Sequence, residues 1–229
     1  MAENYHYSMM MAGMENASIA ANTDGEAALA VGLFASICRD RLGDELLAFA
    51  RRCPTVGLGV HEMPRAALLP ALEAGELALA VMPGTARPGL RSARLWTDRV
   101  MIAMGADHPL AARPMVTVAE LREEIFLVSR QQHGGEMHRL LSHCIRPLAP
   151  ALNGVLLDLG RARLMERVAG GAGLALVCAS HVDELDERVA VRPVDAPGAS
   201  FPVSAYWTAQ SPAWPLSELL RILLSSRAP

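Results

Sequence analysis

The histidines of this sequence are candidates for metal binding or acid–base catalysis. His138 and His143 are five residues apart in a segment expected to be helical, whereas two ligands on one helix face are spaced by three or four residues. No GxSxG, P-loop, GxGxxG or HExxH stretch occurs, and "GGAGLAL" leads into an expected strand rather than out of one. We therefore expect no catalytic residue, no metal site and no cofactor, with an enzyme kept as an alternative.

Polar residues at the ends of expected strands are better candidates for binding a small molecule. Ser36 follows an apolar run and precedes a helical segment, so its hydroxyl and the next N–H groups could hold a carboxylate oxygen. The same position also suits a helix N-cap, and both roles stay open. Ser129 occupies the matching place in the second half of the chain. Cys38 is expected either to line the same site or to be a small buried apolar residue.

The segment after Ser129 adds further candidates. Gln131 and His133 could reach the site, although such residues are more often solvated loop side chains. Arg161 and Arg163 stand in the first turn of an expected helix, where a cation opposes the helix dipole unless an anion is near. This conflict indicates an acidic ligand or a carboxylate partner in the chain, and Arg161 is the better ligand contact because it is nearer the strand end.

Composition and charge exclude several classes of protein. The chain has 229 residues, a net charge of −3 and no run of Lys or Arg longer than two, so it is not expected to bind nucleic acid by itself. Its four cysteines form no CxxC pair, which predicts reduced and mostly buried thiols. Residues 1–28 read as a flexible leader without a secretion signal, and no 18 apolar residues run without a charge. We expect a cytoplasmic protein outside the membrane.

Strand and helix patterns alternate through the rest of the chain and predict an α/β protein. A first group of β-α steps ends in a long extended segment, and a second group follows the Asp-His-Pro turn. Together they predict two lobes, each a mainly parallel sheet flanked by helices. The expected bounds are 29–104 with 206–229 for lobe I and 105–205 for lobe II. The strands are expected at 29–34, 55–62, 76–82, 90–104, 124–129, 153–159, 173–178, 189–194 and 202–209, and the helices at 38–53, 64–75, 116–122, 134–148, 161–171 and 213–226.

Seven stretches in this order resemble the effector-binding domain of LysR-type transcriptional regulators, over residues 29–225. They are "VGLFAS", "LGDELLAFARRCPTVGLGVHE", "LLPALEAGELALAV", "DHPLA", "VTVAELREEIFLV", "RVAGGAGLALV" and "VRPV". The resemblance implies a type 2 periplasmic-binding-protein fold and a small effector bound between the lobes. It makes His108 a turn residue at the entry to lobe II. It also implies that binding is transmitted to a winged helix-turn-helix, a module that this chain is expected to lack.

The resemblance further implies a homodimer, with a tetramer open for a full-length regulator, and DNA contact only through the missing module. The expected dimer contacts are the helices at about 39–50 and 135–143. Two departures from the family pattern are Ala78 in the third strand and Cys178, which replaces a usual proline. A solute-binding protein of the same fold remains the other alternative, and the absence of a secretion signal counts against it.

Overall fold

The computed structural model describes residues 28–34, 39–131, 134–145, 152–208 and 213–225. Within them the chain forms two compact units. Unit 1 holds the chain from the first strand to Leu95 together with the segment from Ser204 onwards, and unit 2 runs from Trp96 to Val203. Strands β4 (Leu90–Gly105) and β10 (Ser200–Thr208) each contribute residues to both units.

The sheet of unit 1 is built on β1 (Ala28–Phe34), which pairs in parallel with β2 (Gly57–Met63) and with β3 (Leu79–Pro83). Strands β1 and β3 are almost wholly buried, as their continuous apolar runs predict for parallel strands that are covered on both faces. The order β2-β1-β3 continues into β10 and β4. The strands expected at 29–34, 55–62 and 76–82 are therefore confirmed to within three residues.

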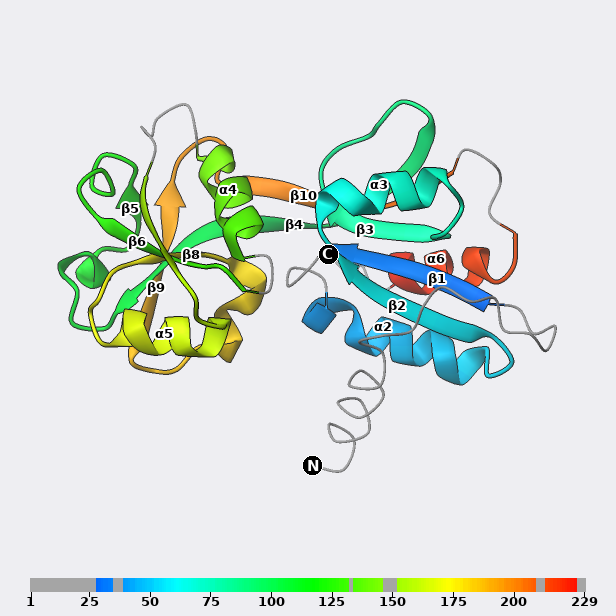
Figure 1. Cartoon of the computed structure of the whole chain (residues 1–229), viewed down its shortest axis with the longest axis horizontal. Coiled ribbons are helices and arrows are strands. Elements are labelled where there is room, and N and C mark those ends of the chain that lie inside the picture. The colour runs from blue at the N-terminus through cyan, green and yellow to red at the C-terminus, as the bar shows by residue number, and fades with distance from the viewer. Residues whose placement is uncertain (1–27, 35–38, 132–133, 146–151, 209–212, 226–229) are drawn as a thin grey trace. The chain divides into compact units, whose positions relative to one another are not determined.

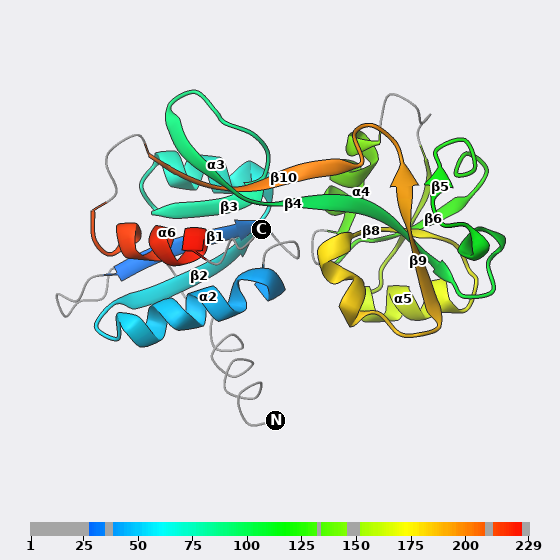
Figure 2. The ribbon, with the colours of Figure 1, turned by 180° about the vertical axis from the view of Figure 1, so that it is seen from behind.

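In the described part of unit 1, three helices cover this sheet, namely α2 (Arg39–Arg52), α3 (Arg65–Glu73) and α6 (Leu216–Ser225). Helix α3 packs on β1 and β3, and α2 packs beside α6, as Figures 1 and 2 both show. Leu46 and Phe49 lie on the buried face of α2, as the apolar spacing predicts.

A carboxylate joins the two neighbouring helices. Glu218 of α6 accepts hydrogen bonds from Arg221 at 2.7 and 3.0 Å and pairs with Arg52 of α2 at 2.5 Å. The hydrogen bond from Arg221 lowers the pKa of Glu218 below its usual 4.5, and the charges of Arg221 and Arg52 add to this effect.

We predict a pH-dependent loss of stability in Glu218→Gln. Because the pKa of Glu218 is lower in the folded than in the unfolded state, its stabilising contribution is complete above about pH 4.5 and is lost as the pH falls through the folded pKa. Urea unfolding should show the variant slightly less stable at pH 7, because the pair is solvent-screened, and equal to the native protein in strong acid. A difference that persists in strong acid would contradict this account.

Unit 2 contains two groups of strands. In the first, β4 pairs antiparallel with β8 (Ala175–Cys178) and β9 (Val189–Asp195), and the short β5 (Val116–Thr117) pairs in parallel with β9. In the second, β6 (Ile125–Ser129) and β7 (Asn153–Leu157) form a parallel pair. The antiparallel pairs make the sheet mixed, because β4 enters from unit 1 against the direction of β8 and β9.

The helices of unit 2 are α4 (Gly134–Cys144), α5 (Arg161–Ala169) and the 3₁₀ helices η1 (Pro109–Ala112) and η2 (Ala179–Glu184). Helix α4 packs on β6 and β8, and α5 packs on β6 and β9 (Figure 1). The apolar face of α5 packs with residues of β4, β6, β8 and β9 in a core whose buried members are Ala103, Leu127, Leu164, Met165, Val168, Ala175, Val177 and Val189.

The prediction of a helix at 116–122 is wrong. Val116 and Thr117 form β5, and the chain then turns until β6 begins at Ile125. Thr117 and Glu120 have the spacing of a helix capping box, and its hydrogen bonds do form: the Thr117 amide and hydroxyl donate to the Glu120 carboxylate, and the Glu120 amide donates back to the Thr117 hydroxyl at 3.4 Å. These bonds close a turn rather than start a helix, since pairing with β9 fully buries Val116 and leaves too few residues before β6.

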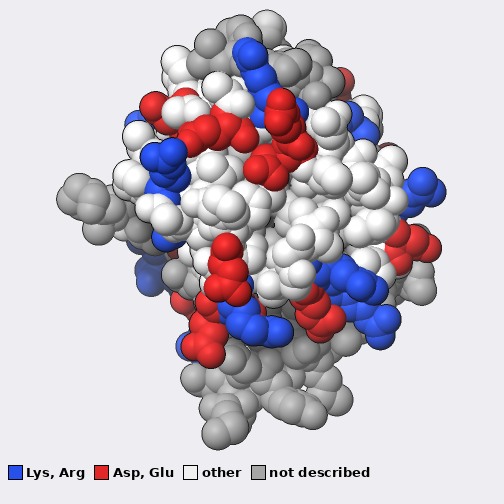
Figure 3. Space-filling model, turned by 90° about the vertical axis from the view of Figure 1, so that its left-hand side faces the viewer, with Lys and Arg blue, Asp and Glu red and all other residues white. Residues whose placement is uncertain are grey.

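Charged side chains of both signs occur on the face of unit 2 seen in Figure 3. Acidic and basic side chains stand next to each other around a broad area without charged residues. Such a surface offers no extended basic patch to a phosphate backbone. Among the described residues, no helix has the length and apolar character needed to cross a membrane.

Candidate functional site

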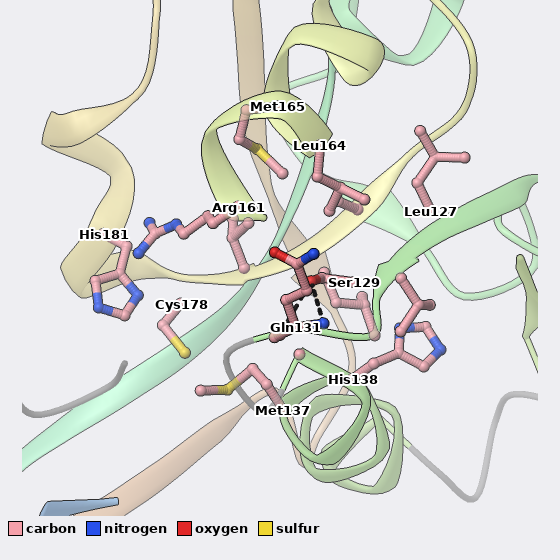
Figure 4. A pocket seen from close by; sticks show the side chains of 15 residues that line it. Leu127, Ser129, Gln131, Met137, His138, Arg161, Leu164, Met165, Cys178 and His181 are labelled. Carbon is pink, nitrogen blue, oxygen red and sulfur yellow. Dashed lines mark hydrogen bonds between the residues drawn. The ribbon is translucent and has the colours of Figure 1, made fainter. Parts of the chain in front are cut away.

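The candidate site is a pocket inside unit 2 with a volume of about 90 Å³ (Figure 4). On the same measure one water needs about 10–15 Å³, so the pocket has room for a small molecule of several non-hydrogen atoms. Five elements supply its walls: the end of β6, helix α4, the first turns of α5, strand β8 and the 3₁₀ helix η2. The lining is mainly apolar, with polar groups from Ser129, Gln131, His138, Arg161, Cys178 and His181.

Ser129 ties the end of β6 to two loops. Its hydroxyl donates to the carbonyl oxygen of Leu159 at 2.6 Å, with the Gln131 carbonyl as a longer acceptor at 3.0 Å, and it accepts from the Gln131 amide at 3.0 Å. The side chain is buried. Because the single hydroxyl proton is directed to the backbone, Ser129 would contact a ligand as an acceptor rather than as a donor.

We predict that Ser129→Ala lowers the free energy of unfolding by about 1–2 kcal/mol, since the Gln131 amide and the Leu159 carbonyl lose their partner in partly buried hydrogen bonds. Chemical denaturation measures this directly. Ser142→Ala is the matched control: the Ser142 hydroxyl is buried without a hydrogen bond to any described residue, so its removal should be neutral or slightly stabilising. Equal losses in the two variants would show that the tie at Ser129 carries no stability.

Gln131 and Arg161 form the polar side of the pocket. Gln131 donates from Nε2 to the Asp158 carboxylate at 3.0 Å. Arg161 is the first residue of α5, whose N-cap Gly160 has no side chain to cap the helix. The guanidinium is partly buried, with Nη2 in the interior. An arginine at this position gives an anion both a positive charge and the amide end of a helix.

A second hollow of about 360 Å³ adjoins this polar side. It is lined by Gln131 and by the residues from Asp158 to Arg163. Gln131 and Arg161 therefore belong to the walls of both hollows. Arg163 lines the second hollow and is absent from the lining of the first.

The lining of the pocket also carries imidazole and sulfur groups. Cys178 ends β8 and His181 follows in η2, and both side chains are buried. His138, on α4, lies against the ring of Phe126 with the ring centres 6.1 Å apart. Burial lowers the pKa of His138, and the charge of neighbouring Arg139 lowers it further, so this imidazole is neutral near pH 7.

Asp98 holds η2 in place and was not found by sequence reasoning. Its buried carboxylate accepts from the Ser180 hydroxyl at 2.6 Å and the Ser180 amide at 3.3 Å, and from the Arg99 amide at 2.8 Å. The signal in the sequence was an aspartate in the apolar stretch "RLWTDRVMIAM". Its partner is 82 residues away, so the pairing of β4 with β8 is needed to see the contact.

The structure brings three of the six predicted effector contacts together, because Ser129, Gln131 and Arg161 line one pocket. Ser36, Cys38 and His133 lie outside the described residues. Within the described part of the chain, no three His, Cys, Asp or Glu side chains are grouped so that they could hold a metal ion.

Comparison with known proteins identifies the class. The family model "LysR substrate binding domain" matches residues 23–228. The BenM effector-binding domain with its effector benzoate is 19% identical, with a TM-score of 0.71 over 88% of this chain and 92% of that one. A mutant OxyR regulatory domain from Pseudomonas aeruginosa is 22% identical (TM-score 0.67, 88% and 99%), and the Synechocystis PCC6803 CcmR regulatory domain in complex with 2-PG is 14% identical (TM-score 0.70, 88% and 97%). No curated protein matches.

Fold and pocket together thus define a ligand-binding α/β domain of the periplasmic-binding-protein type. The chain belongs to the family of LysR substrate-binding domains, so its role is that of the effector-binding part of a LysR-type regulator. The family and the fold class expected from the sequence are confirmed. The similar proteins are regulatory domains of transcription factors.

Proposed function

We propose that the pocket of unit 2 binds a small organic acid and that binding alters a DNA-binding module to which the domain is attached. The observation that carries this proposal is Arg161, which stands at the amide end of α5 in the wall of a mainly apolar pocket. A carboxylate at this position would meet both the positive charge of Arg161 and the amide end of α5. The apolar remainder of the lining suits the hydrocarbon part of such an acid.

Regulation would follow from the way in which the ligand changes the conformations of the domain. An effector shifts the population of conformations only as far as it binds one of them more tightly. Ser129 connects the pocket end of β6 to the loop before α5, so a ligand at Arg161 acts on both. We propose that the domain binds its effector without converting it. We also propose that it forms a homodimer through the helices at about 39–50 and 135–143. It would act in the cytoplasm, where the DNA lies.

A thermal-shift screen against aliphatic and aromatic carboxylates tests the proposal. A ligand at a hundred times its dissociation constant adds about 2.7 kcal/mol to the stability of the native protein. Arg161→Ala should weaken binding about tenfold or more, since a charge-assisted hydrogen bond is lost. Arg163→Ala is the matched control, because Arg163 lies two residues further along α5 and is not part of the pocket lining.

The two variants show whether the acid binds in the pocket or elsewhere. Loss of the shift in Arg161→Ala with an unchanged shift in Arg163→Ala places the acid in the pocket. Equal shifts in the native protein and both variants would overturn the assignment of the site. Consumption of the ligand by the purified protein would favour an enzyme instead.

A further inference from the structure

The polar residues at the end of β6 present oxygen atoms to the pocket of unit 2. The Ser129 hydroxyl directs its proton to the Leu159 carbonyl at 2.6 Å, and the side-chain nitrogen of Gln131 donates to the Asp158 carboxylate at 3.0 Å. Each residue therefore keeps an oxygen that can accept a hydrogen bond from a ligand. We propose that the effector is a 2-hydroxy acid, whose hydroxyl donates to Gln131 Oε1 while its carboxylate meets Arg161. This inference rests on the proposed binding of an acid in the pocket.

Hydrogen-bond chemistry determines which atom of the Gln131 amide is the oxygen. A carboxylate only accepts hydrogen bonds, so the amide atom 3.0 Å from Asp158 Oδ1 is the nitrogen. The reversed amide would bring two acceptors together. Within the described part of the chain, Oε1 accepts no hydrogen bond. In Figure 4 this oxygen lies on the side of the amide that faces Arg161, so a ligand at Arg161 meets an acceptor that can take a proton donor.

Contacts with one loop hold both the backbone and the side chain of Gln131. The backbone amide donates to Ser129 Oγ at 3.0 Å, and Ser129 in turn is bound to Leu159. The side chain is bound to Asp158, the neighbour of Leu159 in the loop between β7 and α5. An acceptor that is fixed in this way discriminates between ligands better than one on a mobile side chain.

The position of Oε1 indicates where the ligand hydroxyl must be. A Cβ atom added to Gly160, the N-cap of α5, would lie 3.4 Å from Oε1. Arg161 is the next residue, and it lines the same pocket as Gln131. Since the acceptor lies beside the residue that precedes Arg161, a hydroxyl that reaches it is close to the carboxylate. A hydroxyl on the carbon next to the carboxylate meets this requirement.

The surrounding charges favour a hydroxyl over an ammonium group as the donor. Arg161 and Arg163 bring two positive charges to the wall of the adjoining hollow, and the one carboxylate there, Asp158, already accepts from Gln131. A ligand cation would be repelled by both arginines, whereas a hydroxyl adds no charge. The apolar part of the lining, which includes Leu127, Leu164 and Met165, suits a hydrocarbon substituent.

Calorimetric titration of the native protein with matched pairs of acids tests the inference. Lactate is compared with propionate and mandelate with phenylacetate, because each pair differs only by the hydroxyl. We expect the hydroxy acid of the pair that fits the pocket to bind about five- to tenfold more tightly, which is the effect of one hydrogen bond. The preference is not larger because Gln131 is an exposed residue, so water competes for its oxygen.

Gln131→Met removes the acceptor and keeps an unbranched side chain of similar length. The ratio of the two affinities should fall to about one in this variant. Arg163→Ala is the control, because Arg163 does not line the pocket, and it should keep the native ratio. A native ratio in Gln131→Met would overturn the assignment of the acceptor.

The outcomes distinguish this inference from the proposed function. If hydroxy and plain acids bind the native protein equally and Arg161→Ala weakens both, the acid site stands and the 2-hydroxy acid is wrong. If no acid of either kind binds, both proposals fail. Tighter binding of the amino acid alanine than of lactate would show that the donor is an ammonium group, and would overturn the hydroxyl.

A measurement on the native protein keeps the test independent of variants that fail to fold. The side-chain amide NMR signals of Gln131 should move further on saturation with the hydroxy acid than on saturation with its plain counterpart. The side-chain signals of Asn153, an exposed amide residue of β7 that is absent from the pocket lining, should stay in place with both. Equal movement of the Gln131 signals with the two acids would contradict a hydroxyl at Oε1.

Discussion

Replacing Asp98 by alanine should lower the free energy of unfolding by about 3 kcal/mol. The buried carboxylate accepts hydrogen bonds from the hydroxyl and amide of Ser180 and from the Arg99 amide. A hydrogen bond to a charged group contributes about 1.5–3 kcal/mol, and donors that are left buried without an acceptor add a further loss. Urea unfolding followed by circular dichroism gives the difference.

Asp107→Ala is the control for this prediction. Asp107 is an exposed aspartate of the same unit, and its removal should change stability by less than about 0.5 kcal/mol. Asp98→Asn should fall between the two, because the amide keeps an acceptor oxygen but not the charge. If Asp98→Ala is as stable as Asp107→Ala, the carboxylate does not hold η2.

Gly173→Ala should also lower the free energy of unfolding strongly, by about 3 kcal/mol. The residue has φ +153°, a conformation that side chains disfavour, and an added Cβ would lie 2.7 Å from the carbonyl oxygen of Ile125. That oxygen accepts the Leu174 amide at 2.8 Å, and the Leu174 oxygen accepts the Leu127 amide at 2.7 Å. Backbone strain costs about 1–3 kcal/mol and a clash against fixed backbone a similar amount.

Gly171→Ala separates strain from crowding. Gly171 has φ +75°, but nothing lies within 4 Å of an added Cβ, so only the cost of backbone strain remains. We expect about 1 kcal/mol at this position, measured by the same denaturation. A loss at Gly173 no larger than at Gly171 would show that β6 moves aside without cost.

Local periodicity predicted most of the elements because each one is specified by its own residues. The run "LAVGLF" reads as a buried strand, and β1 is one. The segment 116–122 was mistaken for a helix because its capping bonds are real, while the competing contact of Val116 with β9 comes from residues almost 80 positions away. Antiparallel pairing of β4 could not be predicted either, since it depends on how the chain passes between the units.

The polar side of the candidate site followed from strand order. Ser129 and the loop before Arg161 come after neighbouring parallel strands, β6 and β7, whose ends meet at the same edge. Three other lining residues were not predictable in this way. Met137 and His138 depend on the rotation of α4, and His181 depends on a 3₁₀ turn that has no apolar period. Whether the predicted contacts bind an effector stays a prediction.

The hydroxyl of Ser129 also determines how the end of β6 and the loop before α5 unfold locally. It binds Gln131 and Leu159, and the Arg130 amide donates to the Leu157 carbonyl at 2.9 Å, so two segments about 30 residues apart are joined at one point. Neither can separate from the core without breaking the bonds of the other. In native-state hydrogen exchange, the amides of Arg130 and Gln131 would therefore open in a single cooperative event, with the end of β7 as part of the same foldon.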